Sequence, residues 1–475
     1  MTLHISLAGR GDLSQRIYRQ IIEGIIDGRL RIGDRLPPSR SLAKQLSVAR
    51  HTVTVAYERL TAEGFLEGRV GAGTFVAPDA VRTIEPKGAP RGAALQPGRR
   101  WRGLDAPLPS GKATPRFDFR VGIPDGSLFP LDVWRRLYAR CSLEAHTGRY
   151  GDPAGEPRLR AAVVRHAAMA RSLRAGADDV VITHGAQQAL DLIGRVLIEP
   201  GDVVAVEEPG YPPVRELFAS MGAEIAPVAV DGEGIVVGDI PAGTKLVYVT
   251  PSHQFPLGTP MSLGRRLALL TWADQHGAAV IEDDYDTEFR FEDRPLDPLQ
   301  SLDRTGRVIY VGTFAKTLVP SLRLGFLVAP PTLIPALRAA RHLSDSHGDP
   351  AMQLTLAQLI EDGRFARHVR RAGSVYAERH RAVKQILADL LAPWLAAVPS
   401  VAGIHVCARL AHHLDLDRVV IEAARRGVAV DRLADYCAGP RQQGLVIGYG
   451  AIATNLIEEG LTVLAGCFPA EQPLG

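Results

Sequence analysis

The sequence predicts an α/β protein in which a small N-terminal winged helix-turn-helix is joined by a linker to a larger domain. Within residues 1–78, an amphipathic helix, a helix-turn-helix pattern and a glycine-rich hairpin follow one another. Residues 79–115 are rich in Pro, Gly and Arg. In residues 116–475, short apolar runs alternate with helical stretches, which is typical of a mainly parallel sheet with flanking helices, and a small C-terminal domain follows.

The composition is globular and excludes several classes of protein. The chain is 46% hydrophobic and 23% charged, and its 475 residues suggest two to four domains. The cysteines form no CxxC motif or Cys/His cluster, so we expect neither disulfides nor a zinc site, and a reducing, cytoplasmic environment fits. The first ten residues lack a signal-peptide pattern, and the longest uncharged stretch, 390–408, contains prolines and a histidine, so no membrane span is predicted.

The charge is unevenly placed along the chain. The net charge is +3, but residues 1–78 and 79–115 each carry +4, which leaves −5 for the remainder. A basic N-terminal part on an acidic body predicts a polyanion partner for that part alone.

The first two helices are predicted from a repeating apolar pattern and from residues that stop or start a helix. An apolar residue recurs at every fourth position, at Leu13, Ile17, Ile21 and Ile25, which predicts an amphipathic helix that ends near Gly28. The Pro37-Pro38 pair cannot lie inside a helix, but Ser39 can cap a short helix over residues 41–46.

A longer helix follows a tight turn, and a wing follows that helix. Arg50, His51 and Thr52 stand where the longer helix begins, and residues 64–76 alternate with glycines in their middle, as in a two-stranded wing. A helix-turn-helix reads DNA through the start of its second helix, while other groups hold phosphates. The alternative is a winged helix that makes protein contacts. Residues 79–115 have no apolar period and are predicted to form a flexible linker.

Five short apolar runs in the larger domain end in polar or aromatic residues. They lie at 180–183, 203–206, 245–249, 278–281 and 308–311, and 263–275 is among the helical stretches between them. In open α/β sheets, ligands bind beyond the carboxyl ends of the strands. The residues that follow these runs are therefore the candidate site.

Three of those residues together favour pyridoxal 5'-phosphate as a cofactor. Lys316 follows a buried strand, and desolvation lowers the pKa of a lysine, so that its amine can form a Schiff base with an aldehyde. Asp283 follows another strand and could pair with a pyridinium nitrogen, and Arg323 could hold a phosphate. Taken singly, Lys316 is more often a surface lysine and Asp283 a strand-end cap.

Further strand ends offer a phosphate cradle and an aromatic wall. The turn that starts at Gly185 leads into a helix, whose free N–H groups bind phosphate well. Tyr211 offers an aromatic face for a pyridine ring. After the run at 245–249, two alternatives stay open for His253. It could bond the ring oxygen, a bond that Gln254 could make instead or that could be lost, or it could be a satisfied core histidine.

Several motifs resemble a known family. GTFAKTLVPSLRLG (312–325) and IEDDYDTEFR (281–290) resemble the fold-type-I aminotransferase domain of the MocR regulators, a subgroup of the GntR family of bacterial transcription factors. LPPSR (36–40), VARHTV (48–53) and GRVGAGTFV (68–76) resemble the GntR DNA-binding domain. The resemblance extends from about Leu13 to nearly the C-terminus, except in the linker.

The resemblance implies a set of site residues. In the cofactor domain it implies phosphate contacts from Gly185, Ala186 and Gln187, a stacking Tyr211, a bond from Tyr285 to the ring oxygen, and Tyr150 reaching the phosphate of a neighbouring subunit. In the winged helix it implies DNA contacts from Arg40, Arg50, His51 and Thr52, with Gly73 and Thr74 at the wing tip. Ala49 departs from the usual serine or threonine, and Tyr150 could instead pack beside an ordinary Asp-Pro turn.

The resemblance also implies a function. We expect a homodimeric DNA-binding regulator that senses an amino compound, or pyridoxal phosphate itself, and the alternative is a working aminotransferase with an accessory DNA-binding domain. Aminotransferases of this fold usually carry an arginine that binds the substrate carboxylate, and here Val446 stands in its place. Turnover is therefore expected to be absent or slow, unless the nearby Arg441 replaces that arginine.

Overall fold

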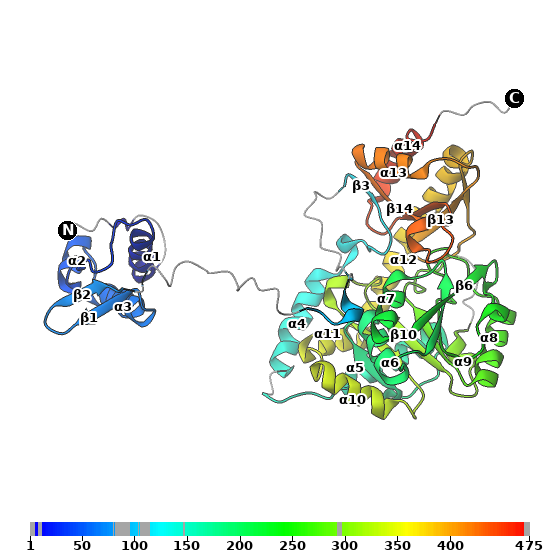
Figure 1. Ribbon diagram of the computed structural model, residues 1–475, viewed down its shortest axis with the longest axis horizontal. Coiled ribbons are helices and arrows are strands. Elements are labelled where there is room, and N and C mark those ends of the chain that lie inside the picture. Colours follow the sequence, from blue (N-terminus) through cyan, green and yellow to red (C-terminus); the bar gives the residue numbers. More distant parts are fainter. Residues whose placement is uncertain are drawn as a thin grey trace. The chain divides into compact units, whose positions relative to one another are not determined.

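The computed structural model divides the chain into two compact units, residues 1–96 and 97–475 (Figure 1). It describes residues 5–7, 12–78, 80, 96–102, 104, 115–145, 148–291 and 297–469. Most of the expected linker, 79–115, lies outside the described residues. Each unit is considered by itself.

The first unit is a winged helix-turn-helix, as the sequence predicts. It contains α1 (Leu13–Ile26), α2 (Ser39–Leu46), α3 (Arg50–Ala62), β1 (Leu66–Arg69) and β2 (Gly73–Val76). The strands pair antiparallel, with Leu66 opposite Val76. The apolar stripe of α1 packs on α3, with Ile17, Ile21 and Leu60 fully buried. Apolar burial of this kind stabilises the unit by about 25 cal/mol per Å².

One detail of α2 differs from the sequence prediction. Ser39 is the first residue of the helix and Pro38 is its N-cap, with no side-chain cap bond. The fixed φ of proline suits this position, so the helix begins one residue earlier than a serine cap would allow. At the other end of the unit, Ala80, which was expected in the linker, is fully buried against this core.

The second unit contains a large, mainly parallel sheet. The strand order is β4-β11-β10-β9-β8-β5-β6-β7, and the neighbours among β10, β9, β8, β5 and β6 are parallel. The strands are β4 (Val180–Thr183), β5 (Val203–Glu208), β6 (Glu224–Asp231), β7 (Gly234–Ile235), β8 (Thr244–Val249), β9 (Ala279–Asp284), β10 (Val308–Thr313) and β11 (Gly325–Val328). Because β11 is antiparallel to both β10 and β4, the strand β4 has the same direction as β10.

Helices cover both faces of this sheet (Figure 1). One face packs against α6 (Ala186–Leu197), α7 (Pro212–Met221) and α10 (Ile334–Asp345). The other packs against α5 (Pro157–Arg171), α8 (Leu263–His276), α9 (Leu299–Leu302) and α11 (Pro350–Glu361), and α4 (Leu131–Ala145) lies against α11. A sheet buried on both faces explains why its strands read as continuous apolar runs.

A second sheet forms the small C-terminal part. Its order is β12-β13-β15-β14-β3, from β12 (Leu395–Ala397), β13 (His405–Leu410), β15 (Gly444–Gly448), β14 (Val428–Arg432) and β3 (Phe117–Phe119). One face packs on α12 (Arg364–Ile386), α13 (Leu416–Arg425) and α14 (Ile457–Ala465). The sequence predicts a small domain at the C-terminus, whereas its edge strand β3 comes from the start of the second unit.

A short basic segment upstream of β3 packs on the large sheet's helices. Residues 99–101 form one turn of 3-10 helix beside α7. Arg100 Nη1 donates to the carbonyl of Met221, 3.0 Å away, at the C-terminal end of α7. A cation suits that end of a helix because the last carbonyls and the macrodipole are negative there. Only Gly222 fits beside it, since an added Cβ would lie 2.7 Å from the Arg100 guanidinium carbon.

Candidate functional site

The carboxyl ends of neighbouring parallel strands bring the predicted cofactor residues to one edge of the large sheet. Asp283 lies near the end of β9, and Lys316 follows β10, which pairs with β9 in register. Tyr211 follows β5, and Gly185 follows β4. The parallel direction of these strands therefore gathers residues that are up to 131 positions apart in the chain.

Lys316 is held in a desolvated position. Its Nζ donates to the carbonyl of Gly122, 2.6 Å away. Burial lowers the pKa of the Lys316 ammonium, and the negative charges of Asp286 and Asp283 oppose that shift. A lysine whose pKa is lowered by burial offers a neutral amine more readily, as a nucleophile that attacks an aldehyde must.

Asp283 carries a buried carboxylate with one oxygen unused. Its Oδ2 accepts a hydrogen bond from Tyr248 Oη at 2.7 Å, while Oδ1 is buried without a partner. Burial raises the pKa of Asp283 to about 7, and the Tyr248 bond opposes that shift. An unsatisfied buried acceptor is costly, so this oxygen is poised to accept a proton or an N–H donor.

The raised pKa predicts a pH-dependent gain in stability when Asp283 is replaced. The folded-state pKa lies above the value of 3.8 for a free carboxyl, so stability is lost as pH rises from about 4 to about 7. Asp283→Asn removes this loss. In cofactor-free protein, its advantage over the wild type should grow by about 2 kcal/mol between pH 5.5 and 8.5, at about 1.4 kcal/mol per pKa unit.

Denaturant unfolding of both proteins at the two pH values measures this difference. Asp239→Asn, which changes an exposed carboxylate of the same unit, is the control and should show no such growth. An Asp283→Asn advantage that is the same at both pH values would contradict the raised pKa.

The phosphate side of the site is built from two close backbone segments. Gly185, with φ of 77°, is the N-cap of α6, so the N–H groups of Ala186 and Gln187 lie in the first turn of that helix. Arg323 has φ of 51°, and its Nη2 donates to the carbonyl of His184 at 2.7 Å. An added Cβ at Gly185 would lie 3.4 Å from Arg323 Nη1, so the guanidinium lies directly against the helix start.

Aromatic rings form a wall beside the strand ends. The Phe255 ring contacts Tyr211 at 5.6 Å, Tyr285 at 5.8 Å and Tyr436 at 5.1 Å between centroids, in edge-to-face geometry. Burial raises the pKa of Tyr211 to about 12, so its phenol stays protonated. Sequence reasoning did not identify Tyr436, which comes from the small domain, because no local motif marks it.

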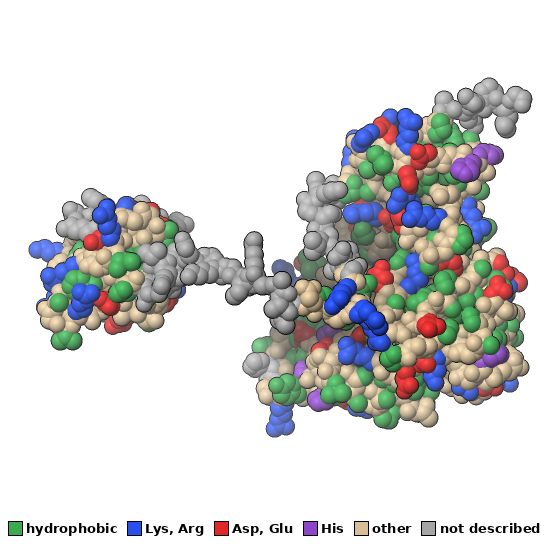
Figure 2. Space-filling view, in the orientation of Figure 1, with side chains coloured by type: hydrophobic (Ala, Val, Ile, Leu, Met, Phe, Trp, Pro, Cys, Tyr) green, Lys and Arg blue, Asp and Glu red, His purple; other side chains and the backbone are tan. Residues whose placement is uncertain are grey.

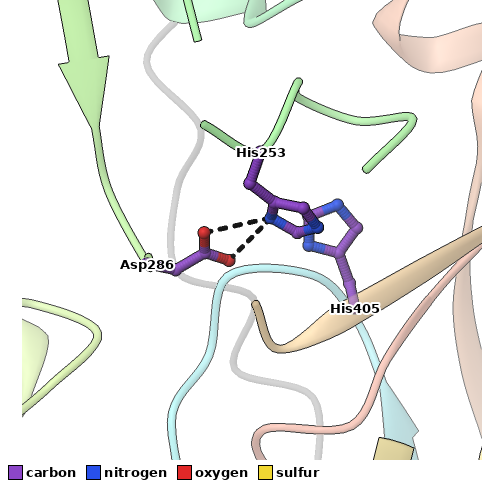
Figure 3. Close-up of side chains that lie close together, drawn as sticks. All are labelled: His253, Asp286 and His405. Atoms are coloured by element: carbon purple, nitrogen blue, oxygen red, sulfur yellow. Dashed lines mark hydrogen bonds and ion pairs between the residues drawn. The ribbon is translucent and has the colours of Figure 1, made fainter. Parts of the chain in front are cut away.

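Figure 3 shows a buried cluster of His253, Asp286 and His405, and the ring of Tyr285 lies 5.9 Å from that of His253 between centroids. His253 Nδ1 is 3.0 and 3.2 Å from the two carboxylate oxygens of Asp286, and its Nε2 is 3.1 Å from Ser400 Oγ. The backbone carbonyl of His253 accepts from Tyr285 Oη at 2.9 Å. Both ring nitrogens of His253 therefore have partners, which favours the core-histidine alternative of the two that the sequence left open.

Tyr150 forms no hydrogen bond with the other predicted cofactor residues among those that the structure describes. It is 89% exposed, its ring contacts His347 edge-on at 6.0 Å, and it has no hydrogen bond among the described residues. A large tyrosine left in water on a protein surface is a candidate contact for another chain.

The residues at the strand ends fit pyridoxal phosphate. Asp283 Oδ1 is an unpartnered buried acceptor that a protonated ring nitrogen would satisfy. Lys316 offers a desolvated amine, and the α6 N-terminus with Arg323 offers an anion site. Sequence reasoning missed Tyr248, which holds Asp283, although a tyrosine inside the apolar run 245–249 signals a buried hydroxyl that needs a partner.

The first unit presents exposed basic groups at the start of α3. Arg40 in α2 and Arg50 and His51 in α3 are exposed, and their side chains have no polar partner among the described residues. The α3 N-cap is Ala49, which gives no side-chain cap bond. Gly73 and Thr74 begin β2, and Gly73 has φ of 116°. Figure 2 shows lysine and arginine side chains on the visible face of this unit.

Comparisons with known proteins agree with this architecture. Residues 13–76 match the bacterial regulatory proteins of the gntR family, and residues 116–443 match aminotransferase class I and II. The chain is 37% identical to the probable rhizopine catabolism regulatory protein MocR of Rhizobium meliloti, covering 98% of this chain and 95% of that protein. It is 35% identical to the HTH-type transcriptional regulator TauR of Rhodobacter capsulatus, covering 96% of each.

Solved structures match the second unit. Pyrococcus horikoshii kynurenine aminotransferase aligns with a TM-score of 0.69 and 26% identity, covering 75% of this chain and 91% of that chain. Fold and site thus define a winged-helix protein with a fold-type-I aminotransferase domain, and the aminotransferases of class I and II are a family that depends on pyridoxal phosphate. The chain belongs to the MocR-type regulators of the GntR family. No helix among the described residues is long and apolar enough to cross a membrane.

Proposed function

We propose that this protein is a cytoplasmic transcriptional regulator that binds operator DNA through its first unit and pyridoxal phosphate through its second. The observation that carries the cofactor proposal is the pair formed by Lys316 and Asp283. A desolvated amine and a buried carboxylate, one of whose oxygens has no partner among the described residues, lie at the ends of neighbouring strands, and each would meet its chemical complement in one cofactor. The sensed molecule is an amino compound or pyridoxal phosphate itself.

Each residue of the proposed cofactor site has a separate task. Lys316 would hold the aldehyde through its amine, and Asp283 would accept a hydrogen bond from the ring nitrogen and keep that nitrogen protonated. Arg323 and the Gly185, Ala186 and Gln187 backbone would hold the phosphate. Tyr211 would cover one face of the ring, and Tyr285 would bond the ring oxygen in place of the carbonyl of His253. When bound, the cofactor supplies an electrophilic carbon that primary amines can engage.

The proposed DNA contacts lie on the helix-turn-helix and the wing. Arg50, His51 and Thr52 would enter the major groove at the start of α3, while Arg40 would hold a phosphate. Gly73 and Thr74, at the wing tip, would lie against the backbone. The exposed and unpaired state of the arginines supports this assignment.

We further propose that the second unit forms a homodimer with shared cofactor sites. A single small DNA-binding module gives limited contact area, so a dimer would add affinity for a two-part operator. Tyr150 would reach the phosphate bound by the partner protomer. Its 89% exposure in the single chain supports this role.

Hybrid dimers test the shared site. One protomer would carry Tyr150→Phe and the other Lys316→Ala. If Tyr150 acts across the interface, the site with an intact lysine receives an intact tyrosine from the other chain, and it should bind cofactor with wild-type affinity. If Tyr150 serves its own chain, that site should stay as weak as in the Tyr150→Phe homodimer. Cofactor absorbance during titration of tagged, purified hybrids measures the affinity.

The small domain favours a sensing function over an enzymatic one. Val446, at the position expected for a carboxylate-binding arginine, is fully buried in β15. Without that arginine, a buried carboxylate costs several kcal/mol, and each 1.4 kcal/mol or so lost from the transition state is about tenfold in rate.

Single-turnover kinetics separate the two functions. Cofactor-loaded protein is mixed with a panel of amino acids and amines, and conversion of the cofactor to its amine form is followed together with operator binding. We expect ligands to change operator affinity with slow or absent conversion. Rapid conversion by a common amino acid, followed by turnover with a keto acid, would make this protein an aminotransferase.

A further inference from the structure

We propose that the ligand sensed by this protein is a primary amine without an α-carboxylate, whose far end is recognised by Asp431. The inference rests on the proposed cofactor site at Lys316 and deepens it. It follows from the side chains on one face of the small sheet, the face to which Val446 belongs.

Three side chains from adjacent strands share that face. Val446 in β15 lies directly opposite Cys407 in β13 and Asp431 in β14. Residues that lie opposite each other in a sheet point to the same side. The other side faces the helices, because Val406, Val430 and Leu445 belong to the core under α12, α13 and α14.

The surroundings of Val446 are apolar and closed. Val446, Cys407 and Leu433 are fully buried in one cluster with Leu257, which comes from the large domain. Val121 and Tyr436 pack against this cluster. A ligand carboxylate placed at Val446 would therefore lose its water among apolar side chains, while the mostly buried Arg215 is already held by the carbonyl of Tyr436 at 2.9 Å and by Glu208 at 3.6 Å.

Asp431 supplies a negative charge at this place. Its Oδ2 accepts from the backbone N–H of Val121 at 2.8 Å and from Tyr436 Oη at 3.1 Å. No hydrogen bond to its Oδ1 is present among the described residues, and Asp431 is only half-buried. One carboxylate oxygen thus stays available to a donor.

The backbone joins Asp431 to Lys316 over a short path. Val121, which binds Asp431, is followed by Gly122, whose carbonyl binds Lys316 Nζ at 2.6 Å. The Val121 nitrogen and the Gly122 oxygen are at most about 7 Å apart, so the carboxylate and the amine lie within roughly 13 Å of each other. A small molecule engaged at Lys316 through its amine could therefore place a second group on Asp431.

The arginines around this face are already engaged or lie in water. Arg120, the cation that acts on Asp431, binds both oxygens of Asp118 at 2.8 and 2.6 Å. Arg432 binds Asp417 and Asp435, each at 2.7 Å. Arg409 and Arg441 are exposed. The balance of charge around this face therefore repels a carboxylate, and it attracts an ammonium group or a hydroxyl donor.

Matched ligand pairs test the proposal on full-length, cofactor-loaded protein. The pairs are putrescine and ornithine, cadaverine and lysine, and ethanolamine and serine, in which the members differ by one carboxylate. Cofactor absorbance and calorimetry measure binding, and fluorescence anisotropy of an operator duplex measures the response. We expect the member without the carboxylate to bind at least about tenfold more tightly in each pair.

Variants then assign the preference to residues. Asp431→Asn should reduce the preference for the diamines about tenfold, and Val446→Arg should shift it towards the amino acids. Asp239→Asn, which changes an exposed carboxylate of the large domain, is the control and should keep the wild-type preference.

Two results would overturn the inference. Amino acids that bind as tightly as their decarboxylated partners would show that another cation, such as Arg409 or Arg441, serves the carboxylate. An unchanged preference in Asp431→Asn would remove Asp431 from recognition. Protein that takes up no pyridoxal phosphate would instead contradict the proposed function, and calorimetry with the same pairs would still decide the ligand class.

Discussion

Lys316→Ala should abolish covalent cofactor binding. Purified wild-type protein should be yellow when loaded with pyridoxal phosphate, and borohydride should fix the cofactor to the chain on Lys316. The variant lacks the amine that the strand ends hold beside Gly122, so it should yield no reducible adduct. Absorbance spectra and mass spectrometry of the reduced protein measure the loss, which should be complete because a methyl group cannot replace a nucleophile.

A second lysine of the same unit provides the control for this prediction. Lys245 is exposed on β8, and Lys245→Ala should bind cofactor as the wild type does. Weak non-covalent binding to Lys316→Ala through Arg323 and the α6 N-terminus is compatible with the proposal. A wild type that stays colourless with added pyridoxal phosphate, or an adduct on another lysine, would refute the assignment.

Arg50→Ala should weaken operator binding about 5- to 150-fold, which corresponds to the ~1–3 kcal/mol typical of a side chain that contacts a base edge. Arg50 is exposed at the first turn of α3, where a recognition helix meets the groove. Its loss should also relax the sequence preference at one position of each half-site. Anisotropy titrations of wild type and variant against an operator duplex and a scrambled duplex measure both effects.

Arg19→Ala controls for the removal of one positive charge from the same unit. Arg19 is exposed on α1, away from the helix-turn-helix, and its loss should have a small effect that fades at higher salt. Equal operator binding by the wild type and Arg50→Ala would show that α3 is not the recognition helix.

The features that could be predicted from sequence are those encoded locally. The 3.6-residue periodicity of α1 and the glycines of the wing need no knowledge of the rest of the chain. The five apolar runs became parallel strands, and their polar ends met at one edge of the sheet. This placement follows from strand direction alone, which is why Asp283 and Lys316 could be paired from the sequence.

The features that could not be predicted depend on contacts between distant segments. Phe117 and Phe119 read as the start of the large domain, yet β3 completes the small sheet beside β14, more than 300 positions later. Asp431 has no motif of its own, and it matters only because β14 places it opposite Val446. Gly122 became the partner of Lys316 through the same long-range pairing.

The contact between Arg100 and the end of α7 sets the working length of the connection between the two units. Ala80 is packed in the first unit and Pro97 begins the second, so 16 residues separate them, fewer than half of the stretch 79–115 that composition marks as linker. Such a connection spans at most about 55 Å when fully extended. In a dimer, a shorter connection raises the effective concentration of one DNA-binding unit near its half-site once the other DNA-binding unit has bound the second half-site. Arg100 attaches this connection to α7, and Tyr211 is the N-cap at the opposite end of that helix, beside the candidate cofactor site. In the proposed dimer, the spacing of half-sites that can be bound would therefore depend on the second unit.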